Sequence, residues 1–575
     1  MLSWKRMLYV ILMVTVISCI FMLYNINEER ARHINITNVQ VESKNFTDIR
    51  PIETAEKPFV WIVGEDAEDG GNFQAEIAAN VKQIFRNLHY VLNEVTDLEP
   101  EKLGKNDLVV FCDDSVGTHT DLIKLEAFLS GGGKIILAAG LPEGNRDSYL
   151  WPILGIREKS IRENYNRLHF EEPLFPIQEE EMDYEGYNMS TRLSVDENAK
   201  VYIRDADSGV PLLYVRTYGE GAICLLNGTF LSDIRCAGLL TGAVGTLQED
   251  FCYPVLGTKT VFLDNFPMIT FINDKVCMRM YGCSTESFVR DVVWPNLQGM
   301  SLRTQTPYTS SVLGVASSEE SFPGINDSLF TAIGKSALQF GGELVYAANC
   351  TDKESIVFHH AFIEKFDSIF TNYKIQGLVM QTDSFQEEMM DIPNAKIKAV
   401  RMNLRGENAG FSCNDRYLTF PAATYGNSLE EGNLFYIASV LGAYGMISHV
   451  FDINTLIAEN EETASWDSDK KQIGLFETEV LKQTAWLEGC VLSQMKDDVK
   501  SWLNLEYSWK RKGNTIILDG SNMVMGQAFF LRTQGEILGA EGADYKKAGN
   551  GYYLLRMQQN HAVITMDNET TQNHK

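Results

Sequence analysis

The sequence predicts an α/β protein of several domains: a doubly wound α/β domain, a (β/α) barrel and a small β-sandwich, behind an N-terminal membrane anchor. Apolar, β-rich runs alternate with helical patterns through most of the chain, which is typical of parallel sheets. The alternation changes to period two near residue 506, as in an antiparallel sandwich. At 575 residues the chain is also too long for one hydrophobic core.

The N-terminus predicts the compartment. Residues 7–24 form a low-polarity run of a length that can span a bilayer, and Lys5 and Arg6 precede it. Because a positive flank stays in the cytoplasm, residues 1–24 are predicted to be a single-pass signal anchor in the cell membrane, with the bulk of the chain extracytoplasmic. Alternatively, residues 16–19 (VISC) resemble a lipobox, in which Cys19 would carry lipid. Residues 25–56 are polar and are predicted to form a stalk.

The composition argues against a nucleic-acid partner. The formal net charge is −27, and such a surface would repel phosphates. The charge suits a solvated surface and could attract a cationic polymer. None of the ten cysteines belongs to a C-x-x-C pair, so a zinc ribbon is not expected. Cys277 and Cys283 are close enough to pair in an oxidising compartment, or they could remain buried thiols.

Residues 57–250 are predicted to form the doubly wound domain. Its expected elements are strands at residues 59–63, 108–112 and 134–138, helices at 73–88 and 121–129, and a hairpin of residues 211–215 and 221–227. This order resembles the fold of class I glutamine amidotransferases. Their nucleophile needs a cysteine between glycines at a tight elbow, and Cys112 lacks those glycines. We therefore expect no catalysis in this domain.

Residues 258–505 are predicted to form the barrel, complete or incomplete, from six or seven strand–helix units. Its expected strands are residues 260–263, 311–315, 343–347, 377–380, 397–402 and 447–451, and its helices include 328–340, 358–373 and 429–441. Residues 477–505 are predicted to be one long amphipathic helix on its outside. Residues 506–575 are predicted to form the β-sandwich and a polar tail.

Asp264 is the first candidate catalytic residue. It lies in residues 261–267 (VFLDNFP), where an apolar run leads into Asp264, Asn265 and a proline. Active sites of barrels are built at the C-terminal ends of strands. A carboxylate there, near a metal-bound water, can take a proton as water attacks an amide or ester carbonyl. Alternatively, Asp264 caps the loop that follows.

His449 is the second candidate. It follows residues 445–448 (GMIS) at another strand end, and Asp452 lies three residues further on. A histidine there can protonate a leaving group, and a nearby carboxylate can fix its tautomer. The alternative is a buried, hydrogen-bonded histidine. His359 and His360 are adjacent at the start of a predicted helix, so their side chains diverge by about 100° and are not expected to share a metal ion.

The order of these features resembles that of a known group of proteins. An anchor, an amidotransferase-like domain, a barrel opening with residues 263–267 (LDNFP), a Gly-x-x-Ser-His strand end and a terminal β domain together resemble an uncharacterised bacterial family. That family is related to the polysaccharide-deacetylase-like part of the Pel exopolysaccharide protein PelA. The resemblance covers roughly residues 58–566. It implies a membrane-tethered protein of exopolysaccharide assembly, with extracellular polysaccharide and synthase or export proteins as partners.

Carried over residue by residue, the resemblance implies an active site that differs from that of relatives at several positions. Asp264 matches the catalytic carboxylate, Asn265 stands where a metal-binding aspartate is expected, and His449 matches a late histidine. Residues 450–452 (VFD) differ from the Pro-Asp-Asp that follows that histidine in relatives. Metal-dependent deacetylases also carry two histidines about four residues apart after the third barrel strand, and residues 346–358 contain none.

Two functions therefore stay open from the sequence. The first is a degenerate deacetylase-like barrel, without a cofactor, that binds glycan or partner proteins. The second is an active polysaccharide deacetylase that uses Asp264 and His449, with Asn265 and Asp452 in support and a divalent metal of the zinc type. The missing histidines favour the first. A third function, of a different class, is a sensor whose residues 58–245 bind a small molecule.

Overall fold

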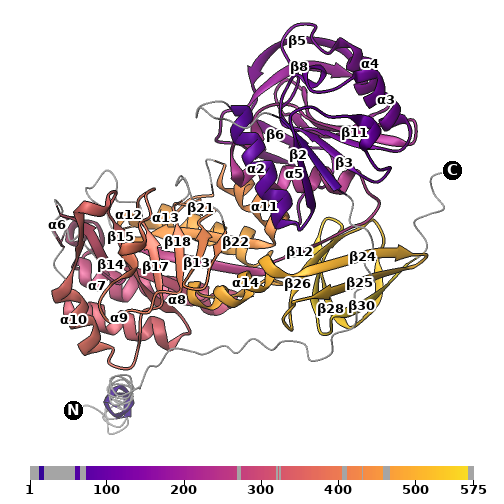
Figure 1. Ribbon diagram of the computed structural model, residues 1–575. Coiled ribbons are helices and arrows are strands. Elements are labelled where there is room, and N and C mark those ends of the chain that lie inside the picture. Colours follow the sequence, from indigo (N-terminus) through magenta and orange to yellow (C-terminus); the bar gives the residue numbers. More distant parts are fainter. Residues whose placement is uncertain are drawn as a thin grey trace, which may run out of the picture.

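The computed structural model describes residues 12–18, 59–64, 73–268, 274–318, 322, 326–403, 411–429, 432–456 and 466–567. Over these residues the chain is a mixed α/β protein, as the sequence predicts, with three β-rich units (Figure 1). The N-terminal unit is purple in Figure 1, the barrel runs from pink to orange, and the C-terminal sandwich is yellow. One cluster of buried apolar side chains is continuous through all three units.

The N-terminal unit is built on a nine-stranded sheet. Five parallel strands form one half, in the order β2 (Val91–Val95), β1 (Phe59–Val63), β3 (Leu108–Phe111), β4 (Lys134–Leu137) and β11 (Gly221–Leu226). The antiparallel half continues with β10 (Pro211–Tyr218), β9 (Ala199–Asp205), β6 (Arg167–Phe170) and β7 (Glu181–Asp183). Separate from this sheet, β5 (Ile156–Asn164) and β8 (Met189–Val195) form a two-stranded ribbon.

Helices cover both faces of this sheet. On one face, side chains of α2 (Phe73–Asn87) and α5 (Ala237–Thr246) belong to one buried apolar cluster. On the other face, side chains of α3 (Leu122–Ser130) and α4 (Trp151–Leu154) belong to a second cluster, together with side chains of the strands. The expected hairpin joins β10 to β11. Its turn needs a glycine at Gly219, which has a φ of 59°, because a Cβ there would lie 2.6 Å from the carbonyl oxygen of Ser130.

The second unit is a barrel of parallel strands. Its strands, in ring order, are β13 (Thr258–Asp264), β14 (Tyr308–Ser317), β15 (Glu343–Asn349), β17 (Gly377–Met380), β18 (Ala399–Met402), β20 (Leu418–Pro421), β21 (Thr424–Tyr425) and β22 (Met446–Asp452). β20 pairs with β18, and β21, which follows β20 after two residues, pairs with β22. Since β22 pairs with β13, the strands close into a ring in which β20 and β21 share one position.

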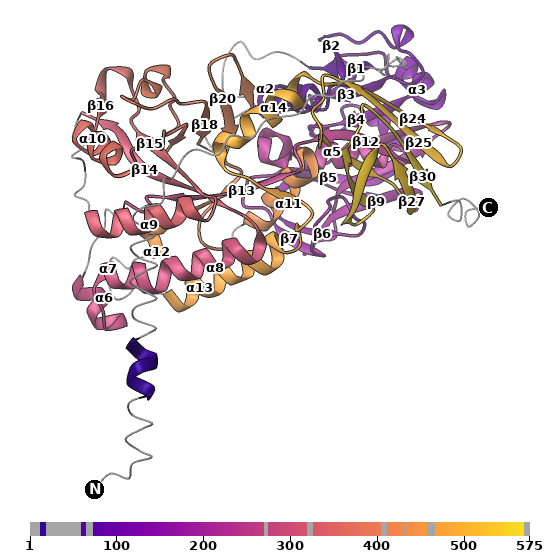
Figure 2. The ribbon, with the colours of Figure 1, turned by 90° about the horizontal axis from the view of Figure 1, so that it is seen from below.

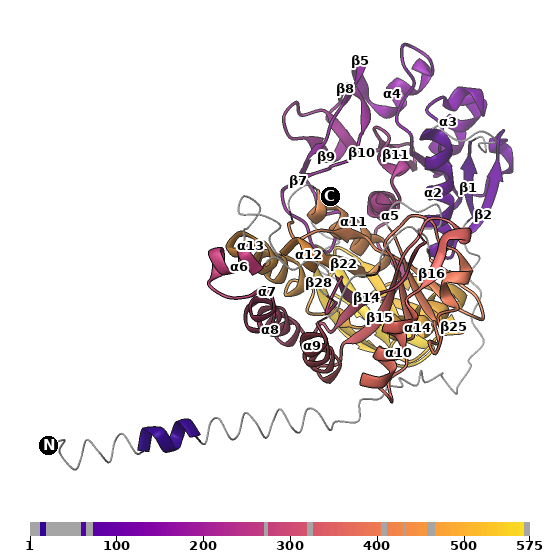
Figure 3. The same ribbon diagram turned by 90° about the vertical axis from the view of Figure 1, so that its left-hand side faces the viewer.

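Helices surround the barrel, and short strands extend it. The helical segments are α6 (Asp274–Tyr281), α7 (Thr285–Phe288), a π-helical turn (Val289–Val293), α8 (Trp294–Thr304), α9 (Asp327–Gln339), α10 (His360–Ile369), α11 (Asn433–Tyr444), α12 (Ile453–Leu456) and α13 (Trp466–Leu475). Helices α8, α9 and α13 lie along one side of the ring (Figures 2 and 3). The added strands are β16 (Ile356–Phe358), beside β14, and β19 (Ser412–Cys413), beside β20. Helix α11 packs against α5 and so joins the barrel to the N-terminal unit.

The structure divides residues 477–505, which the sequence predicts to be one helix. A π-helical segment (Phe476–Leu481) is followed by β23 (Glu488–Gly489), a 3-10 turn (Leu492–Gln494) and α14 (Met495–Asn504). β23 pairs with the start of β13, and a Cβ at Gly489 would lie 2.1 Å from the carbonyl oxygen of Gln305. The helix breaks because its middle lies against the N-terminal end of the barrel, where the Leu492 amide donates to the Thr309 hydroxyl at 3.0 Å.

The third unit is a sandwich of two four-stranded sheets. One sheet has the order β12 (Phe251–Val255), β26 (Ala528–Arg532), β29 (Tyr552–Met557) and β28 (Ala543–Gly549). The other has the order β24 (Glu506–Lys512), β25 (Thr515–Ser521), β30 (His561–Met566) and β27 (Ile537–Glu541). β12 comes from the junction between the N-terminal unit and the barrel, so the sandwich is assembled from two distant parts of the chain.

The predicted membrane anchor is contradicted by the structure. In the described part of the chain, no helix has both the length and the apolar character needed to cross a membrane. Of the predicted anchor, only residues 12–18 are described, and they form a helix shorter than a span requires. Cys19, residues 25–56 and the remainder of residues 1–24 lie outside the described residues. The single-pass membrane location predicted from the sequence is therefore wrong.

Candidate functional site

The C-terminal end of the barrel brings together polar side chains from several strands. β13 and β22 pair in a register that sets Asp264 directly opposite Asp452. Side chains alternate between the two faces of a strand, so opposed residues of parallel neighbours share a face. Both carboxyl groups therefore lie at the same level of the barrel, Asp264 buried at 3% exposure and Asp452 half-buried. The sequence singled out both residues, and the structure brings them together.

Asp264 is held by an arginine that sequence analysis missed. Arg401, from β18, forms a bidentate ion pair with Asp264, with Nη1–Oδ1 and Nη2–Oδ2 distances of 2.9 and 2.8 Å. Ser311 donates a third hydrogen bond, from Oγ to Oδ1 at 3.0 Å. The guanidinium also lies 4.8 Å from the ring centroid of Phe262. A basic residue inside a buried apolar strand was the available signal, because a buried charge requires a partner.

Asn265 and Asp452 form the second half of the cluster. Asn265 has a φ of 58°, and its Nδ2 donates to Asp452 Oδ1 at 3.1 Å. Its Oδ1 accepts a hydrogen bond from Gln381 Nε2 at 3.1 Å, so the amide is held from both sides. Tyr425 donates from its hydroxyl to Asp452 Oδ2 at 2.8 Å, and the residue is 45% exposed. We call the set the barrel-end cluster: Asp264, Asn265, Ser311, Gln381, Arg401, Tyr425 and Asp452.

His449 lies on the other face of β22. It is three residues from Asp452, an odd number, so its side chain points away from the barrel interior. Its ring stacks on Phe476 at a centroid distance of 4.3 Å and is 1% exposed. Nε2–H donates to the carbonyl oxygen of Gly426 at 2.9 Å, and Nδ1 accepts from the Thr424 hydroxyl at 2.7 Å.

The environment of His449 favours a structural role. Burial lowers the pKa of this histidine to about 3, so the ring is neutral near pH 7. Both ring nitrogens are occupied by protein groups. The Gly426 carbonyl fixes the tautomer, whereas Asp452 bonds to Asn265 and Tyr425 instead. This arrangement matches the alternative that the sequence left open, a buried, hydrogen-bonded histidine.

The barrel-end cluster does not offer the donor set of a divalent metal. In the described part of the chain, no three side chains from His, Cys, Asp and Glu gather closely enough to hold one ion. Both oxygens of Asp264 face a guanidinium, whose charge opposes a cation at the same place. The Asn265 oxygen already accepts from Gln381. The ring of His359 lies 4.0 Å from that of Phe322, outside the cluster.

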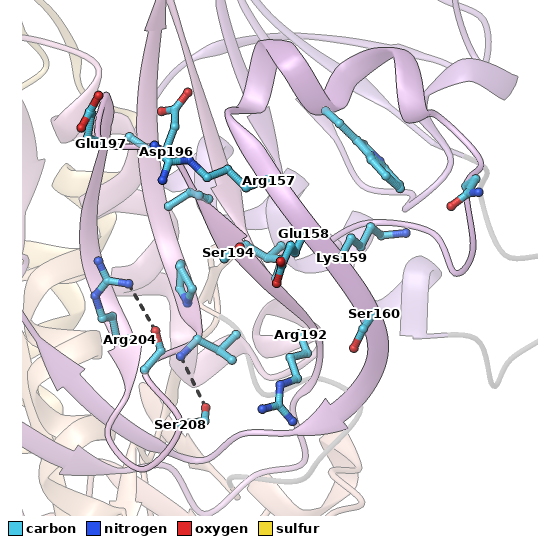
Figure 4. Close-up of a pocket in the computed structure, with 18 residues that line it drawn as sticks. Arg157, Glu158, Lys159, Ser160, Arg192, Ser194, Asp196, Glu197, Arg204 and Ser208 are labelled. Carbon is cyan, nitrogen blue, oxygen red and sulfur yellow. Dashed lines mark hydrogen bonds between the residues drawn. The ribbon is translucent and has the colours of Figure 1, made fainter.

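The N-terminal unit carries a large polar pocket of about 1050 Å³ (Figure 4). It lies between the β5–β8 ribbon and the turns that flank β9. Its charged lining residues have both signs: Arg157, Glu158, Lys159, Arg192, Asp196, Glu197 and Arg204. Several are held by the protein itself; the Lys159 amino group, for example, donates to the Gly144 carbonyl at 2.7 Å.

Cys112 also lies in the N-terminal unit, at the end of β3. Its side chain is buried, and burial raises the pKa of its thiol to about 12. The reactive form of a cysteine is the thiolate, which this environment disfavours. The geometry is therefore unsuited to a nucleophile. All nine cysteines in the described part of the chain are free thiols, including Cys277 and Cys283.

Fold and site together define a mixed α/β protein with a closed parallel barrel and a polar cluster at its C-terminal end. Residues 60–338 match the model of a family described as an uncharacterised protein conserved in bacteria (DUF2194). This range contains the N-terminal unit and the first two barrel strands, with Asp264 and Asn265. No match was found among curated proteins. The particular relation to PelA remains an expectation from the sequence.

Several solved structures are similar to the chain at low identity. Agd3, described as a novel carbohydrate deacetylase, has a TM-score of 0.49 and 8% identity, over 89% of this chain and 99% of that chain. A putative ThuA-like protein from Bacteroides uniformis has a TM-score of 0.28 and 13% identity, over 35% of this chain and 96% of its own. A β-galactosidase from Bacillus circulans sp. alkalophilus has a TM-score of 0.24 and 14% identity, over 34% of this chain and 32% of its own.

Proposed function

We propose that this protein binds a polysaccharide at the C-terminal end of its barrel without hydrolysing it, as a component of exopolysaccharide assembly. The observation that carries the proposal is the bidentate pair between Asp264 and Arg401, both almost fully buried. A general base must reach the proton that it abstracts. Here the candidate base is buried and its charge is already compensated by a guanidinium.

The exposed part of the barrel-end cluster has the chemistry of a sugar site. Tyr425 presents a half-exposed ring, and aromatic rings supply an apolar face together with a polar tip. Beside it, Asp452 and Asn265 offer oxygen and nitrogen atoms that can bond to hydroxyl groups. Asn403 and Asp383, joined by a 2.8 Å hydrogen bond, follow the neighbouring strands β18 and β17 and extend the polar edge.

Binding is tested with a β-1,4-linked tetramer of N-acetylglucosamine, titrated calorimetrically into the full-length chain. Replacing Tyr425 with alanine removes the exposed ring and one hydrogen bond, so we expect the affinity to fall about tenfold. Tyr187→Ala is the matched control, because Tyr187 is an exposed tyrosine of the N-terminal unit. Equal affinity of Tyr425→Ala and the unaltered chain would overturn the proposed site.

A second candidate function is deacetylation with Asp264 as the base. One observation favours it: an arginine fork holds the carboxylate in a fixed orientation, which is how reacting groups are positioned for catalysis. Among the described residues, Asp264 Oδ2 accepts only from Arg401, so an acceptor position remains. Acetate release from the same tetramer, lost in Asp264→Asn, would support this candidate against the binding proposal.

A further inference from the structure

A second polar cleft, of about 550 Å³, lies where the N-terminal unit meets the sandwich. β9 and the segment after α5 form one wall, and the turns after β26 and β28 form the other. Hydrogen bonds across the junction fix the walls: Tyr552 donates to the Leu174 carbonyl at 2.8 Å, and Asn550 donates to the Phe175 carbonyl at 3.0 Å. The cleft is therefore preformed, at a junction of the kind where ligand sites are common.

Arg532 is the unusual group in this cleft. Each of the three acidic side chains that line the cleft is paired with a basic one, in the pairs Glu172–Lys200, Glu536–Lys547 and Glu249–Arg511. Arg532 is half-buried, and its hydrogen bond to the Pro173 carbonyl is 3.5 Å long. No carboxylate in the described part of the chain lies within ion-pair distance of it. A partly desolvated guanidinium without a counter-ion suits a carboxylate, which it can bind with two parallel hydrogen bonds.

We propose that this cleft binds an acidic sugar within an otherwise neutral oligosaccharide, and that Arg532 pairs with its carboxylate. The uncharged lining matches sugar hydroxyls, because it consists mainly of amides and hydroxyls: Thr246, Gln248, Thr533, Gln534 and Asn550. The net charge of −27 repels a continuous polyanion, so the acidic units are spaced by neutral ones. The inference rests on the proposed function in that the ligand is a glycan, but it concerns a different site.

The test compares two matched probes by calorimetric titration into the full-length chain. One is a tetrasaccharide in which glucuronic acid alternates with N-acetylglucosamine, and the other is the same tetrasaccharide after reduction of its carboxyl groups. We expect the acidic probe to bind about tenfold or more tightly than the reduced one. Arg532→Gln should remove this difference, and Arg532→Lys should retain part of it. Equal affinities for the two probes would refute the proposal.

Two further variants protect the test against misfolding and long-range charge effects. Gln534 is exposed in the turn after β26, so Gln534→Glu places a negative charge in the cleft without disturbing the core. It should weaken binding of the acidic probe alone. Lys546→Gln removes an exposed charge of β28 that does not line the cleft, and it should leave both affinities unchanged. An equal loss in Lys546→Gln and Arg532→Gln would mean that only net charge matters, and would refute a site at Arg532.

The two proposals fail independently. Binding of the acidic probe that depends on Arg532, together with no effect of Tyr425→Ala on the neutral tetramer, would refute the barrel site and support the cleft. Binding of the neutral tetramer that depends on Tyr425, with no advantage for the acidic probe, would support the barrel site and refute the cleft.

Discussion

Asp264 and Arg401 form an ion pair that is almost fully buried. Taking both charges out of water costs several kcal/mol per ion, and only a close, well-oriented pair offsets that cost. The two parallel hydrogen bonds and the Ser311 hydroxyl supply this geometry. The same contacts occupy the carboxylate that the sequence marks as a base. We therefore propose a binding role, because the contacts of Asp264 in the fold outweigh the fact that the residue is a carboxylate.

Removing one partner of this pair should strongly destabilise the fold. Arg401→Met leaves Asp264 as an uncompensated buried charge, and we expect the free energy of unfolding to fall by about 3–5 kcal/mol, measured by urea denaturation of the full-length chain. Replacing both residues, in Asp264→Leu with Arg401→Met, should cost less than the sum of the single changes. Arg290→Met is the control, since Arg290 pairs with Asp291 at the surface. An Arg401→Met chain as stable as the control variant would contradict this account.

His449 should make stability fall in mild acid. Its pKa is about 3 in the folded chain, against 6.5 for an ordinary histidine. Below pH 6.5 the unfolded state therefore takes up the proton first, and stability decreases as the pH falls toward 3. Between pH 7 and pH 5 the contribution is about 2 kcal/mol. We expect His449→Gln to lose this pH dependence, measured by denaturation at both pH values. Retention of the full dependence in His449→Gln would show that other groups cause it.

At the scale of elements, sequence periodicity predicted six strands of the barrel but not which face each residue occupies. Residues 447–451 were expected as a strand, and β22 is there. The strand is apolar on both faces, so nothing in its pattern separated His449 from its neighbours. Only the alternation of side chains, counted from Asp452, places His449 on the opposite face of the strand. Arg401 was missed because strand 397–402 was recognised by its apolar residues. The partner of Arg401, Asp264, lies 137 positions away in the sequence, so no local pattern indicates the ion pair.

Other elements depended on contacts that no local pattern contains. β2 is an edge strand with polar residues, and its pairing with β1 defines it. Residues 477–505 have helical periodicity, yet docking on the barrel divides them. β12 lies between the two domains predicted for residues 57–250 and 258–505, and its pairing with β26 makes it a strand of the sandwich. In each case a tertiary contact decides between local structures that the sequence allows.

The docking of residues 492–504 on the barrel predicts a second pH effect, opposite in sign. Glu343 begins β15 and accepts from the Ser493 amide at 3.0 Å, and burial raises its pKa to about 7 from 4.5. The folded chain therefore holds this proton between pH 4.5 and 7, and stability decreases as the pH rises through that range. The full effect is about 3 kcal/mol.

Glu343→Gln should abolish this decrease. The variant keeps an acceptor for the Ser493 amide and does not ionise. Between pH 4.5 and pH 8, its free energy of unfolding should therefore fall less than that of the unaltered chain. Denaturant titrations at the two pH values measure the difference. Parallel pH profiles for Glu343→Gln and the unaltered chain would exclude Glu343 as the source.

At the scale of the whole molecule, the three units form one structure. Their apolar cores are continuous, β12 links the sandwich to the chain between the other two units, and α11 packs on α5. Trp502, fully buried, donates to the Pro254 carbonyl at 3.2 Å and ties α14 to β12. Each of the polar surfaces described above, the barrel end, the pocket beside the β5–β8 ribbon and the cleft at Arg532, therefore belongs to the same structure.

The most direct test of the central claim is acetate release by the full-length chain from the tetramer of N-acetylglucosamine, with Zn²⁺, Co²⁺ or Mn²⁺ added and the bound metal counted in parallel. The account predicts binding of the tetramer with no acetate above the protein-free blank, and no stoichiometric metal. Acetate release accompanied by about one metal ion per chain, and abolished in Asp264→Asn, would contradict it and establish the barrel as a deacetylase.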